Sequence, residues 1–171
     1  MKPVLWSRLD TMARCLMPFG LTVLLVLISV LPLPILGFTR VMPLLPLMSI
    51  YLMAVYHPNL MPVYAVFLIG LLQDILTGIP MGIHALTYLV AYGTVVWQRR
   101  FLVGKSFAVI WVGFSLVGGG GVVMGWGLMS SYHGVLLNPD AILLQYALSL
   151  GLFPVLSWLF VRWQQPFLGN L

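Results

Sequence analysis

Asp74 is the residue of this sequence whose type and position bear most directly on chemistry. It is the one carboxylate inside a hydrophobic segment, because Asp10 and Asp140 fall at segment boundaries. A carboxylate at the centre of a bilayer costs about 2.5–3.5 kcal/mol on insertion scales, and such residues pair with cations or serve ion and proton pathways. A proton relay uses several acids or histidines along one route, and this sequence supplies one acid. We therefore expect Asp74 to have a cationic or hydrogen-bonding partner and no role in proton transport.

The partner is expected at one end of the predicted helix bundle. Asp74 lies one turn before the C-terminal end of its own helix, where the helix dipole disfavours an anion. Arg40 precedes one hydrophobic segment, Gln73 is adjacent, and His84 opens another segment. The sequence thus predicts a polar cluster of Arg40, Gln73, Asp74 and His84 that joins three neighbouring spans. The alternative is that Asp74 turns to water and contacts none of them.

Other combinations of chemically active residues lack the spacing of known sites. His57, His84 and His133 are far apart, and no His-x-x-His, Cys-x-x-Cys or His-Glu-x-x-His pattern occurs. The sequence also has no Gly-x-Ser-x-Gly elbow and no glycine-rich loop followed by Lys-Ser or Lys-Thr. We therefore expect a protein that is not an enzyme and that holds no metal and no cofactor.

The composition indicates an integral membrane protein. Hydrophobic residues make up 61% of the 171 residues, charged residues make up 6%, and the mean hydropathy is +1.07. A soluble domain usually carries about 25% charged residues, because its surface faces water. The net charge of +5 does not indicate a nucleic-acid protein, since the basic residues stand singly or in small groups between apolar segments. The predicted surroundings are membrane lipid, and no nucleic-acid partner is expected.

The apolar segments predict an all-α, polytopic bundle in one domain, with six spans. About 20 residues cover the hydrocarbon core. Residues 1–15 form a cytoplasmic or interfacial lead, and the predicted spans are residues 16–36, 41–56, 60–77, 83–97, 106–129 and 141–161. The second and fourth segments are short, so five spans stay an alternative.

The distribution of Lys and Arg predicts the orientation. With six spans, one face receives seven of the eight basic residues and the other receives Arg40. The positive-inside rule then places both termini in the cytoplasm. The strongest basic cluster is Arg99, Arg100 and Lys105, for which orientation alone is a sufficient explanation. Contact with anionic lipid or a cytoplasmic partner is an additional option.

Glycines in the fifth segment predict close helix packing. Gly118, Gly119, Gly120 and Gly121 are consecutive, and Gly121 and Gly125 have the small-xxx-small spacing that lets helix backbones approach. We expect a kink or a close crossing there. We favour a contact within this chain over a contact with a partner protein.

Residues 68–93 (LIGLLQDILTGIPMGIHALTYLVAYG) carry a family resemblance. Gly-Leu-Leu-x-Asp, a Thr-Gly turn and Pro-x-Gly-x-x-Ala-Leu resemble the signature of the bacterial rod shape-determining MreD family, most closely its alphaproteobacterial versions. Residues 43–58 are similar to the family's proline-rich helix, whereas the four consecutive glycines depart from its usual pattern. The resemblance implies that Asp74, Gly78, Gly82 and His84 serve the fold or partner binding.

The resemblance also implies a function and a set of partners. Members of the MreD family are non-enzymatic components of the cell-wall elongation machinery in the bacterial inner membrane. They bind the bitopic periplasmic protein MreC, and through it they connect to MreB, RodA and a penicillin-binding transpeptidase. Their fold is similar to that of the substrate-binding subunits of energy-coupling-factor transporters. The alternative function is therefore a transporter subunit that binds a small, vitamin-like solute.

Overall fold

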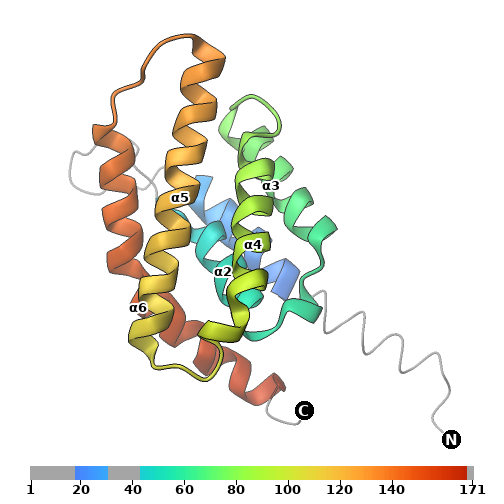
Figure 1. Ribbon diagram of the computed structural model, residues 1–171. Coiled ribbons are helices and arrows are strands. Elements are labelled where there is room, and N and C mark those ends of the chain that lie inside the picture. Colours follow the sequence, from blue (N-terminus) through green and yellow to red (C-terminus); the bar gives the residue numbers. More distant parts are fainter. Residues whose placement is uncertain (1–17, 31–42, 169–171) are drawn as a thin grey trace, which may run out of the picture.

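The described part of the chain is all-helical, as the sequence predicts. The computed structural model describes residues 18–30 and 43–168, with side chains through Arg162, and these residues form no strand. The helices are Pro18–Val30, α2 (Leu45–Tyr56), α3 (Val63–Thr77), α4 (Ile83–Leu102), α5 (Phe107–His133) and α6 (Asp140–Leu168), with the short 3₁₀ helix η1 (Pro58–Leu60) after α2 (Figure 1). Arg40 and the lead over residues 1–15 lie outside the described residues.

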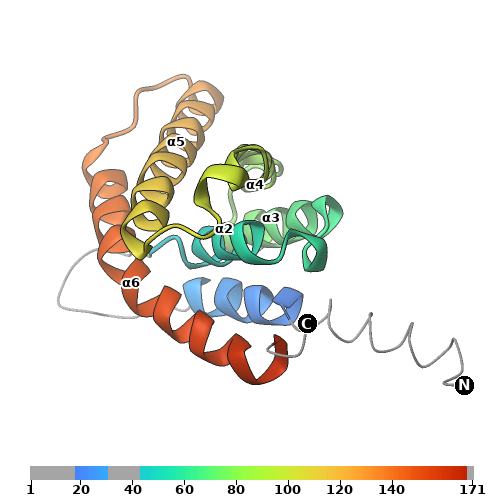
Figure 2. The same cartoon turned by 60° about the horizontal axis from the view of Figure 1, so that its bottom comes forward.

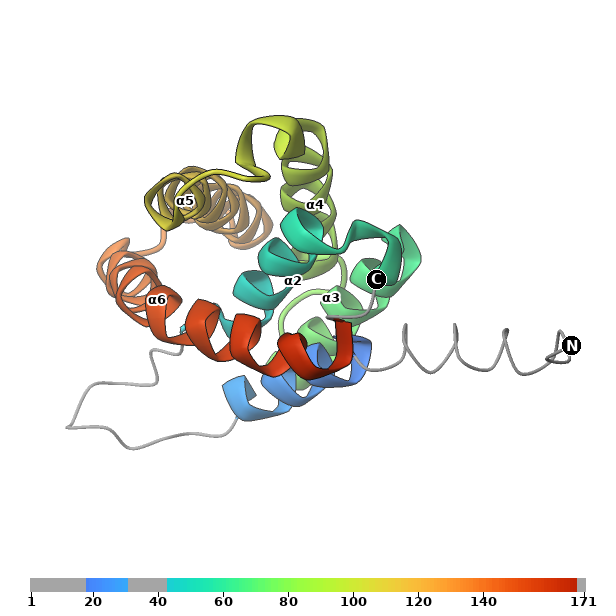
Figure 3. The same ribbon diagram turned by 90° about the horizontal axis from the view of Figure 1, so that it is seen from below.

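Helix α2 lies at the centre of the bundle. Every residue from Pro46 to Val55 is buried, which is why this segment is apolar on all sides. Figure 3 shows α2 surrounded by the other helices, with α3 and α4 on one side and α5 and α6 on the other. The helix Pro18–Val30 lies beside α6 (Figure 2) and bonds to α2, because the Thr22 and Ser49 hydroxyls are 2.8 Å apart.

Three aromatic rings from three helices form the centre of the core. Phe114 of α5 stacks on Phe153 of α6 with 4.4 Å between ring centroids, and Tyr51 of α2 meets both rings edge-on. The Tyr51 hydroxyl donates a hydrogen bond to the carbonyl of Ile110 at 2.8 Å. Gly113 makes this approach possible, because a Cβ there would stand 2.5 Å from the Tyr51 hydroxyl.

Two of the described helices have the length and hydropathy to cross a membrane. They are α5 and the Asp140–Arg162 part of α6, and only 22% and 17% of their most apolar windows are buried inside the protein. Exposed apolar side chains such as Leu116, Val123 and Leu159 cover their outer faces. This pattern is typical of helices that face lipid and differs from that of a soluble core helix.

Six crossings stay a prediction. The apolar helices Pro18–Val30, Leu45–Tyr56 and Val63–Thr77 have fewer residues than the about 20 of an ideal span. Helix α4 has 20 residues, and it continues through Arg99 and Arg100 to Leu102, beyond the predicted end at residue 97. Likewise α6 continues past residue 161, the predicted end of the last span.

A tryptophan of α5 donates a hydrogen bond to a carbonyl that a proline leaves free inside α6. Pro154 has no N–H to donate to the carbonyl of Leu150, and a proline in a helix interior bends the helix. Helix α6 changes direction along its length (Figure 1). The indole Nε1 of Trp111 donates to the freed Leu150 carbonyl at 3.2 Å. This hydrogen bond thus joins α5 to α6 at the point where α6 bends.

Trp111→Phe is expected to lower the free energy of unfolding by about 0.5–1.5 kcal/mol, the net contribution of one hydrogen bond. Unfolding can be followed by circular dichroism during SDS titration in mixed micelles. Trp97→Phe is the control, because Trp97 is 81% exposed. Adding Pro154→Ala should restore most of the loss, since alanine has a backbone N–H that can serve the Leu150 carbonyl. Equal losses in the two Trp→Phe variants would contradict this assignment.

Candidate functional site

The Asp74 side chain caps the neighbouring helix. It is fully buried, and its Oδ2 accepts the backbone N–H of Gly82 at 2.8 Å. Its Oδ1 accepts the backbone N–H of His84 at 2.9 Å and lies 2.8 Å from the imidazole Nδ1 of the same residue. Since a carboxylate only accepts hydrogen bonds, Nδ1 is the protonated ring nitrogen in this pair. Asp74 thus satisfies backbone donors at the start of α4 from the last turn of α3.

Two glycines give the chain the path that brings α4 back to Asp74. Gly78 ends α3 in the left-handed conformation (φ 68°), and its N–H bonds to the carbonyl of Asp74. Gly82 precedes α4 with φ 107°. Residues with a Cβ rarely adopt such angles, so both positions favour glycine. Gly78 and Gly82 therefore shape the turn between α3 and α4.

The dipoles of two helices act on the Asp74 carboxylate. The dipole of its own helix, α3, disfavours an anion at the C-terminal end. However, the carboxylate lies at the N-terminus of α4, where the free N–H groups and the positive end of the dipole favour a negative charge. The backbone N–H groups of α4 are therefore hydrogen-bonding partners of the kind expected for Asp74, and two of its three donors belong to that backbone.

The predicted polar cluster is present in part. Asp74 and His84 are paired, so the alternative in which Asp74 turns to water is wrong. Gln73 is buried but points elsewhere, since its Oε1 accepts a long hydrogen bond of 3.4 Å from the Ser29 hydroxyl. Gln73 therefore connects α3 to the helix Pro18–Val30, and the pair of Asp74 and His84 connects α3 to α4. Arg40, the fourth predicted member, lies outside the described residues.

Gly70 is a residue of this region that the site prediction missed. A Cβ at Gly70 would stand 2.3 Å from the Cα and 2.6 Å from the backbone N of Ala85. The backbones of α3 and α4 therefore touch one turn before Asp74. A signal was present in the sequence, because a glycine inside an apolar helix often marks close helix packing.

The glycines of α5 do not interrupt the helix, which runs unbroken from Phe107 to His133. Gly121 and Gly125 face Thr87 of α4, where added Cβ atoms would meet it at 3.4 and 3.8 Å. Gly119 faces the Tyr146 hydroxyl of α6, Gly118 faces the Phe114 ring of its own helix, and Gly120 meets open space. Gly121 and Gly125 therefore contact α4 within the chain, through side-chain atoms of Thr87 and without a backbone clash.

The basic cluster contains one residue with a structural contact. Arg99 donates from Nε to the carbonyl of Val55 at 3.0 Å, which satisfies the C-terminal end of α2. Arg100 and Lys105 are exposed. Burial lowers the pKa of His57 below its usual range, and the nearby Arg99 guanidinium lowers it further. His57 is therefore neutral at neutral pH, beside the end of α2.

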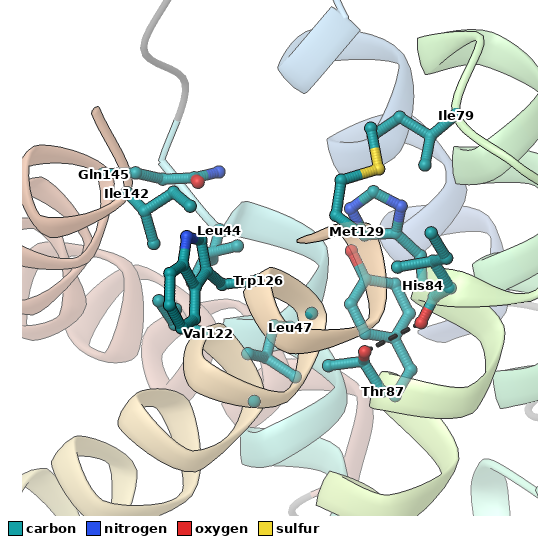
Figure 4. A pocket seen from close by; sticks show the side chains of 14 residues that line it. Leu44, Leu47, Ile79, His84, Thr87, Val122, Trp126, Met129, Ile142 and Gln145 are labelled. Atoms are coloured by element: carbon teal, nitrogen blue, oxygen red, sulfur yellow. Dashed lines mark hydrogen bonds between the residues drawn. The ribbon is translucent and has the colours of Figure 1, made fainter. Parts of the chain in front are cut away.

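A cavity opens next to the pair of Asp74 and His84. Figure 4 shows His84 and Met129 on one side of it and Gln145, Ile142 and Trp126 on the other. The walls come from α2, α4, α5 and α6 and from the turn after α3. The Trp126 indole is held in place by a hydrogen bond of 3.0 Å to the carbonyl of Leu137. Neither Tyr88 nor Gln145, which line this cavity, was among the predicted site residues.

Within the described residues, no group of three or more His, Cys, Asp or Glu side chains is arranged to hold a metal ion. The chemistry that the site offers is hydrogen bonding, from an oriented imidazole, a tyrosine hydroxyl and an amide. Comparison of the chain with protein-family models, with curated proteins and with solved structures found no match.

Proposed function

We propose that this protein is a membrane scaffold of the MreD type, which binds an MreC-like bitopic periplasmic protein and helps to organise peptidoglycan synthesis and maintain rod shape. Through that partner it is connected to MreB, RodA and a penicillin-binding transpeptidase. Its place is the bacterial inner membrane, with several crossings and both termini in the cytoplasm. The bias of Lys and Arg supports this orientation.

One observation carries the scaffold proposal. Both carboxylate oxygens of Asp74 are occupied by N–H groups of the same chain. A proton or ion carrier needs an acid that is open to a water-filled route. Asp74 instead fixes the turn between α3 and α4, so the segment that resembles the MreD signature builds a rigid helix pair. A rigid helix pair with apolar outer faces suits a protein that positions partners.

The test is affinity purification from cells in a mild detergent, followed by mass spectrometry. We expect an MreC-like protein to co-purify with the wild-type chain, and depletion of the chain to cause loss of rod shape. Asp74→Asn should reduce recovery of the partner more than Asp140→Asn does at equal amounts of folded protein. If no cell-wall protein is recovered with the wild-type chain, the scaffold proposal is wrong.

The alternative is a solute-binding transporter subunit, which the cavity beside His84 favours. It predicts that the purified chain carries a solute and associates with transport ATPases. Recovery of such ATPases in place of cell-wall proteins in the same purification would favour it.

A further inference from the structure

Two adjoining cavities lie at the end of the bundle where α3 turns into α4. Their volumes are about 170 and about 260 Å³. Sites for drug-sized ligands measure about 300–1,000 Å³, so these cavities suit a small molecule or the head group of a larger one. The residues that line both cavities are Leu44, Ile79, His84, Tyr88, Ile142 and Gln145.

Tyr88 lines both cavities. The residue is 1% exposed, and no described residue forms a hydrogen bond with its hydroxyl. Other buried tyrosines of the bundle are satisfied: Tyr51 donates to Ile110 and Tyr92 donates to Met61, both at 2.8 Å. Among the described residues, the buried side-chain atom without a partner is Ser130 Oγ, so the Tyr88 hydroxyl is open to the cavity and not sealed in the core. An occupant of the cavity can therefore form a hydrogen bond with it.

His84 offers a second hydrogen-bonding atom in a fixed direction. Asp74 holds Nδ1, which leaves Nε2 as the ring atom available to a ligand. The imidazole ring lies 5.7 Å from the Tyr88 ring, between centroids, and its side chain is 20% exposed. Across the cavity, Gln145 of α6 presents an amide, which can donate and accept (Figure 4).

The described residues offer no free charge to a ligand in the cavities. No described Lys or Arg lines either cavity, so an anion meets no cationic partner there. A cation likewise meets no free carboxylate among the described residues, because both oxygens of Asp74 are engaged with α4. Most of the remaining lining is apolar, including Leu44, Ile79 and Ile142.

We propose that this cavity binds a small uncharged molecule, or the uncharged head group of a lipid, that carries a hydrogen-bond donor and acceptor next to an apolar body. Tyr88, His84 Nε2 and the Gln145 amide bind the polar part, and the walls from α2 and α6 bind the apolar part. The site goes beyond the scaffold role and does not depend on it, because a bound molecule is compatible with either function.

Benzamide is the probe, because it pairs an uncharged amide with an apolar ring. Full-length protein with isotope-labelled histidine, in detergent micelles, is titrated with benzamide while the side-chain NMR signals are recorded. His57→Gln and His133→Gln identify the His84 signal by elimination. We expect benzamide to shift the His84 signal to saturation. Benzoate and benzamidinium are charged analogues of about equal size. Each should bind at least about tenfold more weakly than benzamide, because its buried charge would lack a partner.

Tyr88→Phe is the decisive variant. It removes a hydroxyl that has no partner among the described residues, so the midpoint of unfolding should not fall, while benzamide affinity should drop about three- to tenfold. Tyr64→Phe is the matched control, since Tyr64 is 70% exposed and far along α3 from this turn. Gln145→Leu, from a different helix, should also weaken binding. The proposal is overturned if benzamide leaves the His84 signal unchanged up to its solubility limit, or if both variants bind it as well as the wild type.

A competition experiment distinguishes the two sources of the ligand. Mono-oleoylglycerol carries an uncharged head with hydroxyls and a carbonyl on a long chain. If it displaces benzamide from the wild type, and Tyr88→Phe weakens its binding, the occupant is a lipid head group. If it does not displace benzamide, the occupant is a free solute. Binding of benzoate as tight as that of benzamide would overturn the assignment of an uncharged ligand.

Discussion

Asp74→Ala is expected to lower the free energy of unfolding by about 3–5 kcal/mol, because three hydrogen-bond donors lose their acceptor and each unsatisfied buried donor costs about 1–3 kcal/mol. The substitution leaves the backbone N–H groups of Gly82 and His84 and the imidazole Nδ1 without their acceptor. Because Asp74 is fully buried, water does not replace the lost acceptor without rearrangement. SDS titration in mixed micelles, followed by circular dichroism, measures the change.

Two further variants test whether the loss of stability comes from losing the Asp74 cap or simply from losing an acidic side chain. Asp74→Asn keeps one acceptor oxygen but turns an NH₂ group toward an N–H of α4, so we expect a loss of about 1–3 kcal/mol. Asp140→Asn is the control, because Asp140 is exposed in the first turn of α6, where its charge contributes about 0.3–1 kcal/mol. If all three substitutions had the same small effect, Asp74 would not cap α4 in the membrane-embedded protein.

Gly70→Ala is expected to lower the free energy of unfolding by about 1–3 kcal/mol, as overpacking does in close-packed interiors. The new Cβ would stand 2.3 Å from the Ala85 Cα, and backbone atoms of a helix cannot turn aside as a side chain can. Helices α3 and α4 must therefore move apart. The same SDS titration measures the loss, and Gly70→Val should lose more than Gly70→Ala.

Gly93→Ala is the matched control for this prediction. Gly93 lies inside α4 as Gly70 lies inside α3, but a Cβ there meets nothing within 4 Å. Alanine at Gly93 should leave the stability unchanged or raise it by about 0.5–1 kcal/mol, because glycine is the poorer helix former. Similar losses for the two glycines would contradict a close contact at Gly70.

The two sites should be coupled. Separation of α3 from α4 by Gly70→Ala also moves His84 away from Asp74, because His84 is adjacent to Ala85. The double variant Gly70→Ala, Asp74→Asn should therefore lose less free energy than the sum of the single losses. An additive result would mean that the helix contact and the carboxylate cap act independently.

The sequence by itself determined the all-helical fold class of the described chain and the positions of most of its helices. Apolar segments of helical length over residues 60–77 and 106–129 correspond to α3 and α5, because hydrophobicity and chain breaks such as Gly78 and Gly82 are local properties. The sequence also singled out Asp74 as a buried acid in need of a partner. These inferences depend on residue type and spacing, which require no knowledge of how the helices pack.

Only the tertiary structure decided which groups satisfy Asp74. Two of its three donors are backbone N–H groups of α4, and no residue type marks a free N–H. Three other features likewise depend on which helices are neighbours. They are the contact of Gly70 with Ala85, the hydrogen bond from Trp111 to the carbonyl freed by Pro154, and the Tyr88 hydroxyl, which has no partner among the described residues. A linear sequence shows which groups need partners, and the packing of the helices decides which groups become those partners.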